Sequence, residues 1–157
     1  MNLALSIAVD ATLITLVLAL AAFGLAIIYG LVGVINMGHG AMLTLGAYFA
    51  WATTTAGIPF GLAVLLSALG VCVVGLLFEH LVIRFFYDRP FETLLLTWAF
   101  FLIATEVIKI VFGTDFRNVE SPLPGAFELA GLKIPAYRSA VAGFTLLLIG
   151  ASAFVFF

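Results

Sequence analysis

The chain has 157 residues, of which 65% are hydrophobic and 9% are charged, and its formal net charge is −2. Soluble domains carry charge on about a quarter of their residues, so this composition excludes an ordinary soluble protein and indicates an integral membrane protein. No basic cluster of the kind that contacts phosphates is present, which excludes nucleic-acid binding. The single cysteine, Cys72, has no partner for an internal disulfide, and we expect it to be a small buried apolar residue.

Five apolar segments follow one another along the chain, each about as long as a helix that crosses a bilayer. They predict transmembrane helices at about 12–34, 38–55, 60–78, 93–112 and 140–157. The expected fold class is all-α, a polytopic transmembrane helix bundle in a single domain over residues 1–157. The last segment reaches Phe157 without the polar flank that spanning helices normally carry, so we expect these residues to be the N-terminal part of a longer polypeptide.

The first two predicted helices lie in a long run without formal charge. No Asp, Glu, Lys or Arg occurs from Ala11 to Phe78, and the run is interrupted by one polar, glycine-rich segment, GVINMGHG, at residues 33–40. Backbone that leaves helical geometry inside a bilayer must be satisfied by other protein groups or by cavity water. The segment is therefore the first candidate for a functional site.

Two polar side chains of this segment, Asn36 and His39, lie between glycines that allow close approach, among them Gly38 and Gly40. Neutral Asn and His can donate and accept hydrogen bonds along a solute pathway without the desolvation cost of a full charge. Alternatively, Asn36 caps the second helix and His39 bonds a nearby carbonyl, so that both only shape the break. The sequence leaves both interpretations open.

Small residues recur every fourth position in the first two helices. Such stripes let helix backbones approach closely in lipid, so they predict helix packing. The residues are Ala22, Ala26 and Gly30 in the first helix and Gly46, Ala50 and Thr54 in the second.

The fourth predicted helix carries the remaining polar candidates. Thr97 and Trp98 offer a hydroxyl and an indole donor that either line a cavity or pack in the core. Glu106 and Lys109 lie one turn apart near the other end, either as a paired interfacial anchor or as an outer gate.

Two polar connections separate the later helices. We place residues 79–92 in the cytoplasm by the positive-inside rule, because residues 113–139 form a longer loop with mixed charges; the 113–139 loop is then outside. In the first connection Glu79 is expected to pair with Arg84, and Arg89-Pro90 to start the fourth helix.

In the outer loop, FELAGLKIP alternates apolar and polar residues around Ala130-Gly131. This pattern predicts a small β-hairpin, either a docking surface or a cap over the helix ends. No metal-ligand spacing, nucleophile elbow or phosphate-binding loop is present, so the sequence predicts no catalytic residue and no metal site.

Two stretches carry a resemblance to a known family. GLAIIYGLVGVINMGHGAMLTLGAY, residues 24–48, and LVIRFFYDRPFETLLLTW, residues 81–98, resemble the inner-membrane permeases of ATP-binding cassette importers for branched-chain amino acids and for urea or short amides. In that family the glycine-flanked Asn and His recur, at Asn36 and His39 here. An acidic residue often follows the His-Gly pair, whereas this chain has Ala41.

The resemblance implies a bacterial-type, multi-pass inner-membrane protein that moves its solute by alternating access. It also implies a second homologous permease, a periplasmic solute-binding protein, and cytoplasmic ATPase subunits that bind ATP and magnesium. The family's cytoplasmic coupling loop would follow the fifth helix. Branched-chain amino acids or a related small polar solute are the main expectation and urea or short amides the alternative; a non-catalytic packing protein, or a membrane enzyme using His39, are the alternatives of another class.

Overall fold

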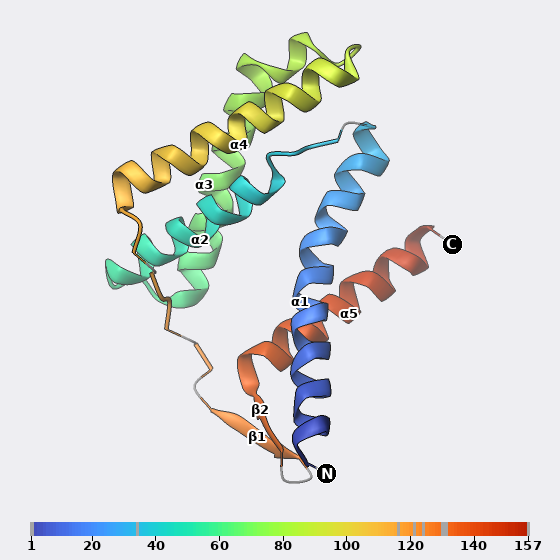
Figure 1. Cartoon of the computed structure of the whole chain (residues 1–157), viewed down its shortest axis with the longest axis vertical. Helices are drawn as coiled ribbons and strands as arrows, with labels where there is room; N and C mark the ends of the chain where they lie inside the picture. Colours follow the sequence, from blue (N-terminus) through green and yellow to red (C-terminus); the bar gives the residue numbers. More distant parts are fainter. Residues whose placement is uncertain are drawn as a thin grey trace. The chain divides into compact units, whose positions relative to one another are not determined.

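The long apolar segments form helices because a helix satisfies every interior backbone N–H and C=O within the segment itself. The computed structural model describes residues 2–33, 35–115, 117–120, 122–123, 125–129 and 132–156. In chain order these form α1 (Asn2–Val32), α2 (His39–Thr55), α3 (Phe60–Leu81), the 3-10 turn η1 (Ile83–Phe85), α4 (Pro90–Phe112), β1 (Ala126–Leu129), β2 (Leu132–Pro135) and α5 (Ala136–Phe156), as Figure 1 shows. The predicted all-α polytopic fold class is confirmed.

Four helical stretches in the described part of the chain are long and apolar enough to cross a membrane: Leu3–Leu31, Phe60–Phe85, Pro90–Phe112 and Ala136–Phe154. The helix α2 is shorter, with 17 residues. At 1.5 Å per residue it rises about 26 Å, less than the roughly 30 Å of a hydrocarbon core. It is short because it begins only at His39, after the break.

Three helices begin earlier than the apolar pattern indicates, among them α5, which starts at Ala136 rather than near residue 140. The helix α1 starts at Asn2 and includes Asp10, since no Gly or Pro interrupts residues 2–23 and a helix does not end where hydrophobicity ends. The helix α4 starts at Pro90, as the Arg89-Pro90 pair predicted, because the missing N–H of proline costs nothing in a first turn.

The prediction that Cys72 is buried is wrong, because its side chain is exposed. Lipid is as apolar as a protein core, so an apolar side chain on a spanning helix gains nothing by facing inward. Hydrophobicity therefore does not distinguish the buried face from the exposed face here.

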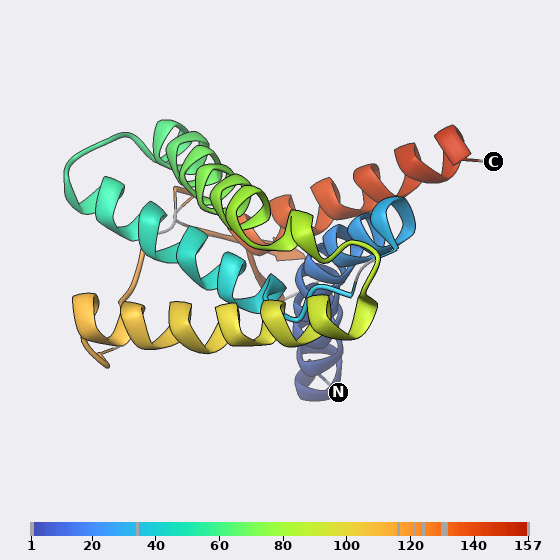
Figure 2. The same ribbon diagram turned by 90° about the horizontal axis from the view of Figure 1, so that it is seen from above.

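The chain divides into two compact units, residues 28–120 and residues 1–27 with 121–157. That both units belong to a single transmembrane domain over residues 1–157 stays a prediction. The first-named unit holds α2, α3 and α4. Figures 1 and 2 show that α2 and α4 lie side by side and run in the same direction.

Within this unit, α2 packs against α3 through small residues. A Cβ atom on Gly70 would lie 2.9 Å from the ring of Phe49, and one on Gly46 would lie 3.5 Å from Val71. Glycine thus permits the close approach on both helices. In α1, by contrast, Ala22, Ala26 and Gly30 are exposed, so the packing role predicted for that stripe stays a prediction.

The other unit contains the predicted hairpin. Strands β1 and β2 pair antiparallel, with Phe127 opposite Ile134 and Glu128 opposite Lys133. The predicted turn residues, 130 and 131, lie outside the described residues. The hairpin itself is confirmed, while its role in docking stays a prediction.

Candidate functional site

The segment between α1 and α2 is held by specific hydrogen bonds at both of its ends. The helix α1 closes at Gly33, whose N–H donates to the carbonyl of Tyr29 at 2.8 Å. Gly33 has φ +70°, in the left-handed region that only glycine adopts without strain. The helix α2 starts six residues later, at His39. The break between the two helices therefore falls at the polar, glycine-rich segment of the sequence.

Asn36 forms a local turn at the end of this segment. Its side-chain Oδ1 accepts the N–H of Gly38 at 2.9 Å, the bond of an Asx turn, and its backbone carbonyl accepts the N–H of His39 at 3.4 Å. The N-cap residue of α2 is Gly38, with no side-chain cap. Asn36 thus shapes the entry into α2 from two residues before the cap position, which differs from the predicted capping role.

A second anchor ties the segment to α4. The N–H of Met37 donates to Oγ1 of Thr97 at 3.1 Å, and the Thr97 hydroxyl donates to the carbonyl of Leu94 at 2.9 Å. Thr97 is only 3% exposed. One buried hydroxyl therefore satisfies an N–H that has no helical partner, as non-helical backbone in an apolar environment requires.

Glycine at position 38 allows this anchor to form. A Cβ atom there would lie 3.0 Å from the carbonyl oxygen of Thr97, 3.0 Å from a ring carbon of Phe100 and 3.1 Å from Oδ1 of Asn36. The ring of Phe100 is itself held against Phe78, with ring centroids 4.4 Å apart. The segment and α4 are therefore in direct van der Waals contact.

His39, Gly40 and Ala41 form the first turn of α2. His39 is half-buried and Gly40 is exposed. A Cβ atom on Gly40 would lie 3.9 Å from the ring of Phe101. Ala41 is 1% exposed. An acidic side chain at position 41, as the resemblance leads one to expect, would bury a charge at considerable cost. In this chain the methyl group fits the contact.

The other sequence candidates lie away from this cluster. Trp98 is 50% exposed, since it points about 100° around α4 from Thr97. Glu106 is exposed and forms an ion pair with Lys109, three residues later, with Nζ of Lys109 2.6 Å from Oε1 of Glu106. Nine residues of α4 separate Thr97 from Glu106, about 14 Å of helix. Glu106 is therefore not brought to the loop, and its role as an interfacial anchor or an outer gate stays a prediction.

A pocket of about 240 Å³ lies beside the segment. It is lined by the end of α1, the loop and the first turns of α4, at Tyr29, Gly33, Ile35, Pro90, Phe91 and Leu94. Sequence reasoning missed this pocket and the Met37 and Phe100 contacts, because each depends on residues about sixty positions apart.

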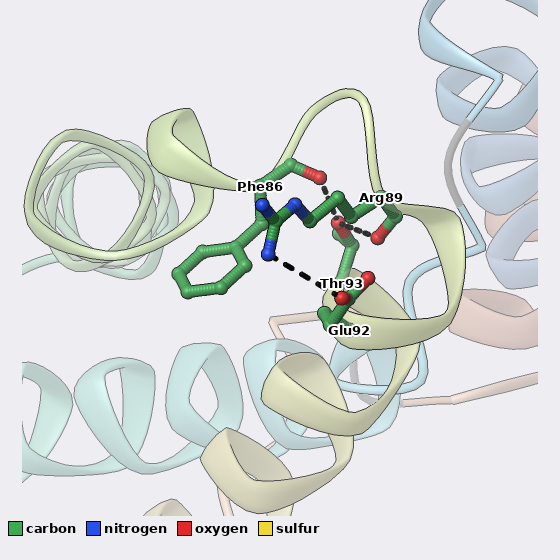
Figure 3. Close-up of polar contacts among 4 residues, drawn as sticks. All are labelled: Phe86, Arg89, Glu92 and Thr93. Carbon is green, nitrogen blue, oxygen red and sulfur yellow. Dashed lines mark hydrogen bonds and ion pairs between the residues drawn. The ribbon is translucent and has the colours of Figure 1, made fainter.

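The connection that leads into α4 is fixed by a fully buried threonine. The hydroxyl of Thr93 lies 2.7 Å from the carbonyl of Phe86 and 3.1 Å from that of Arg89, and Arg89 forms an exposed ion pair with Glu92 at 3.7 Å (Figure 3). Thr93 is 0% exposed. It sets where the chain enters α4, one turn before Thr97.

The expected pair of Glu79 with Arg84 does not form. Glu79 accepts the hydroxyl proton of Tyr87 at 2.8 Å, while Arg84 lies 3.3 Å from the ring nitrogens of His80 and stacks over Phe85 at 4.5 Å. The chain leaves α3 after Leu81, so Arg84 turns to its fourth preceding neighbour instead. The hydrogen bond to Glu79, partial burial and the carboxylate charge raise the pKa of Tyr87.

The long apolar helices are those of a multi-pass membrane protein. A family model described as branched-chain amino acid transport system / permease component matches residues 7–157. The chain belongs to this family of transport permeases, which confirms the resemblance. No curated protein and no solved structure matches the chain significantly.

Proposed function

We propose that the chain is the transmembrane permease subunit of an ATP-binding cassette importer in a bacterial-type inner membrane. Its solute is a branched-chain amino acid or a related small polar molecule, with urea or a short amide as the alternative within the same family. The family match supports the transport role, and the structure of the broken segment supports a solute pathway beside it.

The observation that carries the proposal is the bond from the Met37 N–H to the Thr97 hydroxyl. It secures non-helical backbone between apolar helices, and such backbone persists at membrane depth only where protein buries it or where it lines a water-filled cavity.

The pocket of about 240 Å³ beside the segment is the proposed place for the solute. Its walls come from Tyr29 at the end of α1, from Ile35 in the loop, and from Pro90, Phe91 and Leu94 of α4. Ligand pockets in proteins usually begin at about 300 Å³, so this one suits a small solute with an aliphatic side chain.

The same connections indicate how access can alternate. Met37 moves with α4 because Thr97 holds it, whereas Gly33 ends α1 in a conformation that permits a sharp change of direction. A shift of α4 against the end of α1 therefore changes the pocket that both line. The energy for such a shift is supplied by ATP and magnesium on partner ATPase subunits, with a second permease and a periplasmic binding protein completing the complex.

Uptake by proteoliposomes that hold the transport complex containing this chain tests the proposal. We expect ATP-dependent uptake of radiolabelled leucine that excess isoleucine and valine abolish and urea does not. Inhibition by urea or acetamide instead would favour the alternative solute. Uptake of neither class would contradict the transport proposal and favour a packing protein.

Two variants of Asn36 separate its roles. Asn36→Asp keeps the oxygen that accepts the Gly38 N–H, whereas Asn36→Ala removes it. If the side chain only shapes the turn, Asn36→Asp keeps near-normal uptake. Loss of uptake in both variants, with folding retained, indicates that the amide N–H contacts the solute. If the complex transports neither class of solute but has an enzymatic activity that requires His39, the result favours the alternative of a membrane enzyme.

A further inference from the structure

A second pocket, of about 320 Å³, lies at the other end of α2 and α4. It is lined by Ala47, Tyr48, Trp51, Thr114, Asp115, Arg117 and Val119. Trp51 lies twelve residues after His39, about 18 Å along the α2 axis, so this pocket is separate from the one beside the loop. Neither the family match nor the proposed solute site accounts for it.

The aromatic wall of this pocket is preorganised. Phe112 packs against Tyr48 with ring centroids 4.8 Å apart and against Trp51 edge-on at 5.9 Å. Aromatic pairs prefer offset-stacked or edge-to-face geometry, and the contact of Phe112 with Trp51, with ring planes at 90°, is edge-to-face. The rings of Tyr48 and Trp51 therefore form a fixed apolar surface for an aliphatic group.

The cationic side of the pocket is also held in place. The guanidinium of Arg117 lies 4.9 Å above the ring of Trp51, and its Nη2 donates to the carbonyl of Phe112 at 2.9 Å. A guanidinium has five N–H donors, so the bond to Phe112 leaves other donors for a carboxylate. The side chain loses little further freedom when it binds one.

An uncommitted carboxylate completes the pocket. Asp115 lines it together with Arg117, yet within the described residues no ion pair joins the two and Asp115 has no hydrogen-bond partner. One negative and one positive group beside an apolar wall match the three parts of an α-amino acid: ammonium, carboxylate and aliphatic side chain. Carboxylates recognised by arginine form the stronger, charge-assisted class of hydrogen bond.

We propose that this pocket binds a free α-amino acid with an aliphatic side chain, its carboxylate on Arg117, its ammonium on Asp115 and its side chain against Tyr48 and Trp51. The proposal rests on the proposed transport function, to which it adds a capture site on the solute's route. The helix α4 connects the two pockets: its first turns line the pocket beside the loop, and its last residue, Phe112, packs against Tyr48 and Trp51 of this one.

Tryptophan fluorescence of the full chain in phosphatidylcholine nanodiscs tests the pocket. The chain has two tryptophans, so Trp98→Phe leaves Trp51 as its only indole. We expect L-leucine to change Trp51 emission with saturation. 4-Methylpentanoate, which lacks the ammonium, and 3-methylbutylamine, which lacks the carboxylate, should each bind at least about tenfold more weakly, as expected for a lost hydrogen bond to a charged group.

Asp115→Asn and Arg117→Gln should each weaken leucine binding by about tenfold or more. Glu120→Gln is the matched control, because it removes an exposed carboxylate from the same segment but outside the pocket. Circular dichroism checks that each variant folds. Since Asp115 makes no hydrogen bond or ion pair with another described residue, Asp115→Asn remains informative even if Arg117→Gln unfolds the segment.

Three results overturn the proposal: an absence of any leucine response, equal leucine binding in Asp115→Asn and Glu120→Gln, or leucine uptake at wild-type kinetics in Asp115→Asn. Arg117 would then be an interfacial anchor only. Uptake by the transport complex distinguishes this failure from that of the transport function. If Asp115→Asn takes up leucine with wild-type kinetics, the proposed binding pocket is refuted and the proposed transport function stands. If Trp51 emission saturates with leucine but the complex takes up no leucine, the transport function is refuted and the binding pocket stands.

Discussion

The close contact at Gly38 leads to a quantitative prediction for Gly38→Ala. The added methyl group would lie 3.0 Å from both the Thr97 carbonyl oxygen and the Phe100 ring. The carbonyl belongs to α4 backbone, and the ring is packed against Phe78, so neither neighbour can move easily. Overpacking of this kind costs about 1–3 kcal/mol.

Gly40→Ala is the matched control in the same motif. Its methyl group would have one neighbour, Phe101 at 3.9 Å, which is an ordinary contact. Gly40 lies in α2, and replacing a helical glycine by alanine stabilises by about 0.5–1 kcal/mol. The two variants should therefore differ by at least about 1.5 kcal/mol in the free energy of unfolding.

Thermal unfolding in detergent micelles, followed by circular dichroism, measures this difference. In a chain of this size each 1 kcal/mol shifts Tm by about 2–4 °C, so Gly38→Ala should melt at least about 3 °C below Gly40→Ala. Gly38→Ala combined with Phe100→Leu should recover part of the loss, because the shorter side chain vacates one of the two contacts. A Gly38→Ala variant as stable as Gly40→Ala would refute the docking of the loop on α4.

Three further predictions concern hydroxyl groups. Thr97→Val should destabilise the protein by about 1–3 kcal/mol in chemical unfolding, because it leaves the Met37 N–H without an acceptor. Thr97→Ser keeps the hydroxyl and should retain most of the stability. An equal loss of stability in the two variants would contradict the bond from Met37 to Thr97. Thr93→Val should destabilise by about 1–2 kcal/mol in the same assay, and an unchanged midpoint would contradict its role in fixing the start of α4. The pKa of Tyr87 should lie above its ordinary value of 10.0. The stability that its hydrogen bond to Glu79 contributes is therefore complete below pH 10 and is lost as the pH rises through the raised pKa. Glu79→Gln should lower the pKa of Tyr87 in an ultraviolet titration referenced to Tyr87→Phe.

Local patterns in the sequence predicted most of the helical architecture. The apolar segments indicated five helices, Arg89-Pro90 indicated where α4 begins, and the alternation in FELAGLKIP indicated the hairpin. Each of these follows from neighbouring residues, whose spacing and backbone preferences are visible in the chain itself. The break at residues 33–38 was also visible, because glycines and an asparagine interrupt an otherwise apolar run.

The contacts that fix the site could not be predicted in this way. Met37 and Thr97 are sixty residues apart, and the bond uses a backbone N–H, which no side-chain pattern marks. Trp98 and Glu106 were selected for polarity alone, although helix geometry points one away from the loop and places the other several turns from it. Burial was equally unpredictable for Cys72, because lipid and protein core select the same side chains.

The central claim is that the segment between α1 and α2 lies on the solute pathway, and cysteine labelling tests it directly. Cys72→Ala removes the native thiol, and Ile35→Cys places a new one in the loop at a position that is 49% exposed and lines the pocket. Leu65→Cys on α3, at a position that is 61% exposed and does not line the pocket, is the control. In the transport complex we expect a charged, water-soluble maleimide to label Ile35→Cys much faster than Leu65→Cys, and leucine to slow that labelling. Equal, slow labelling of both positions, unaffected by leucine, would contradict the account.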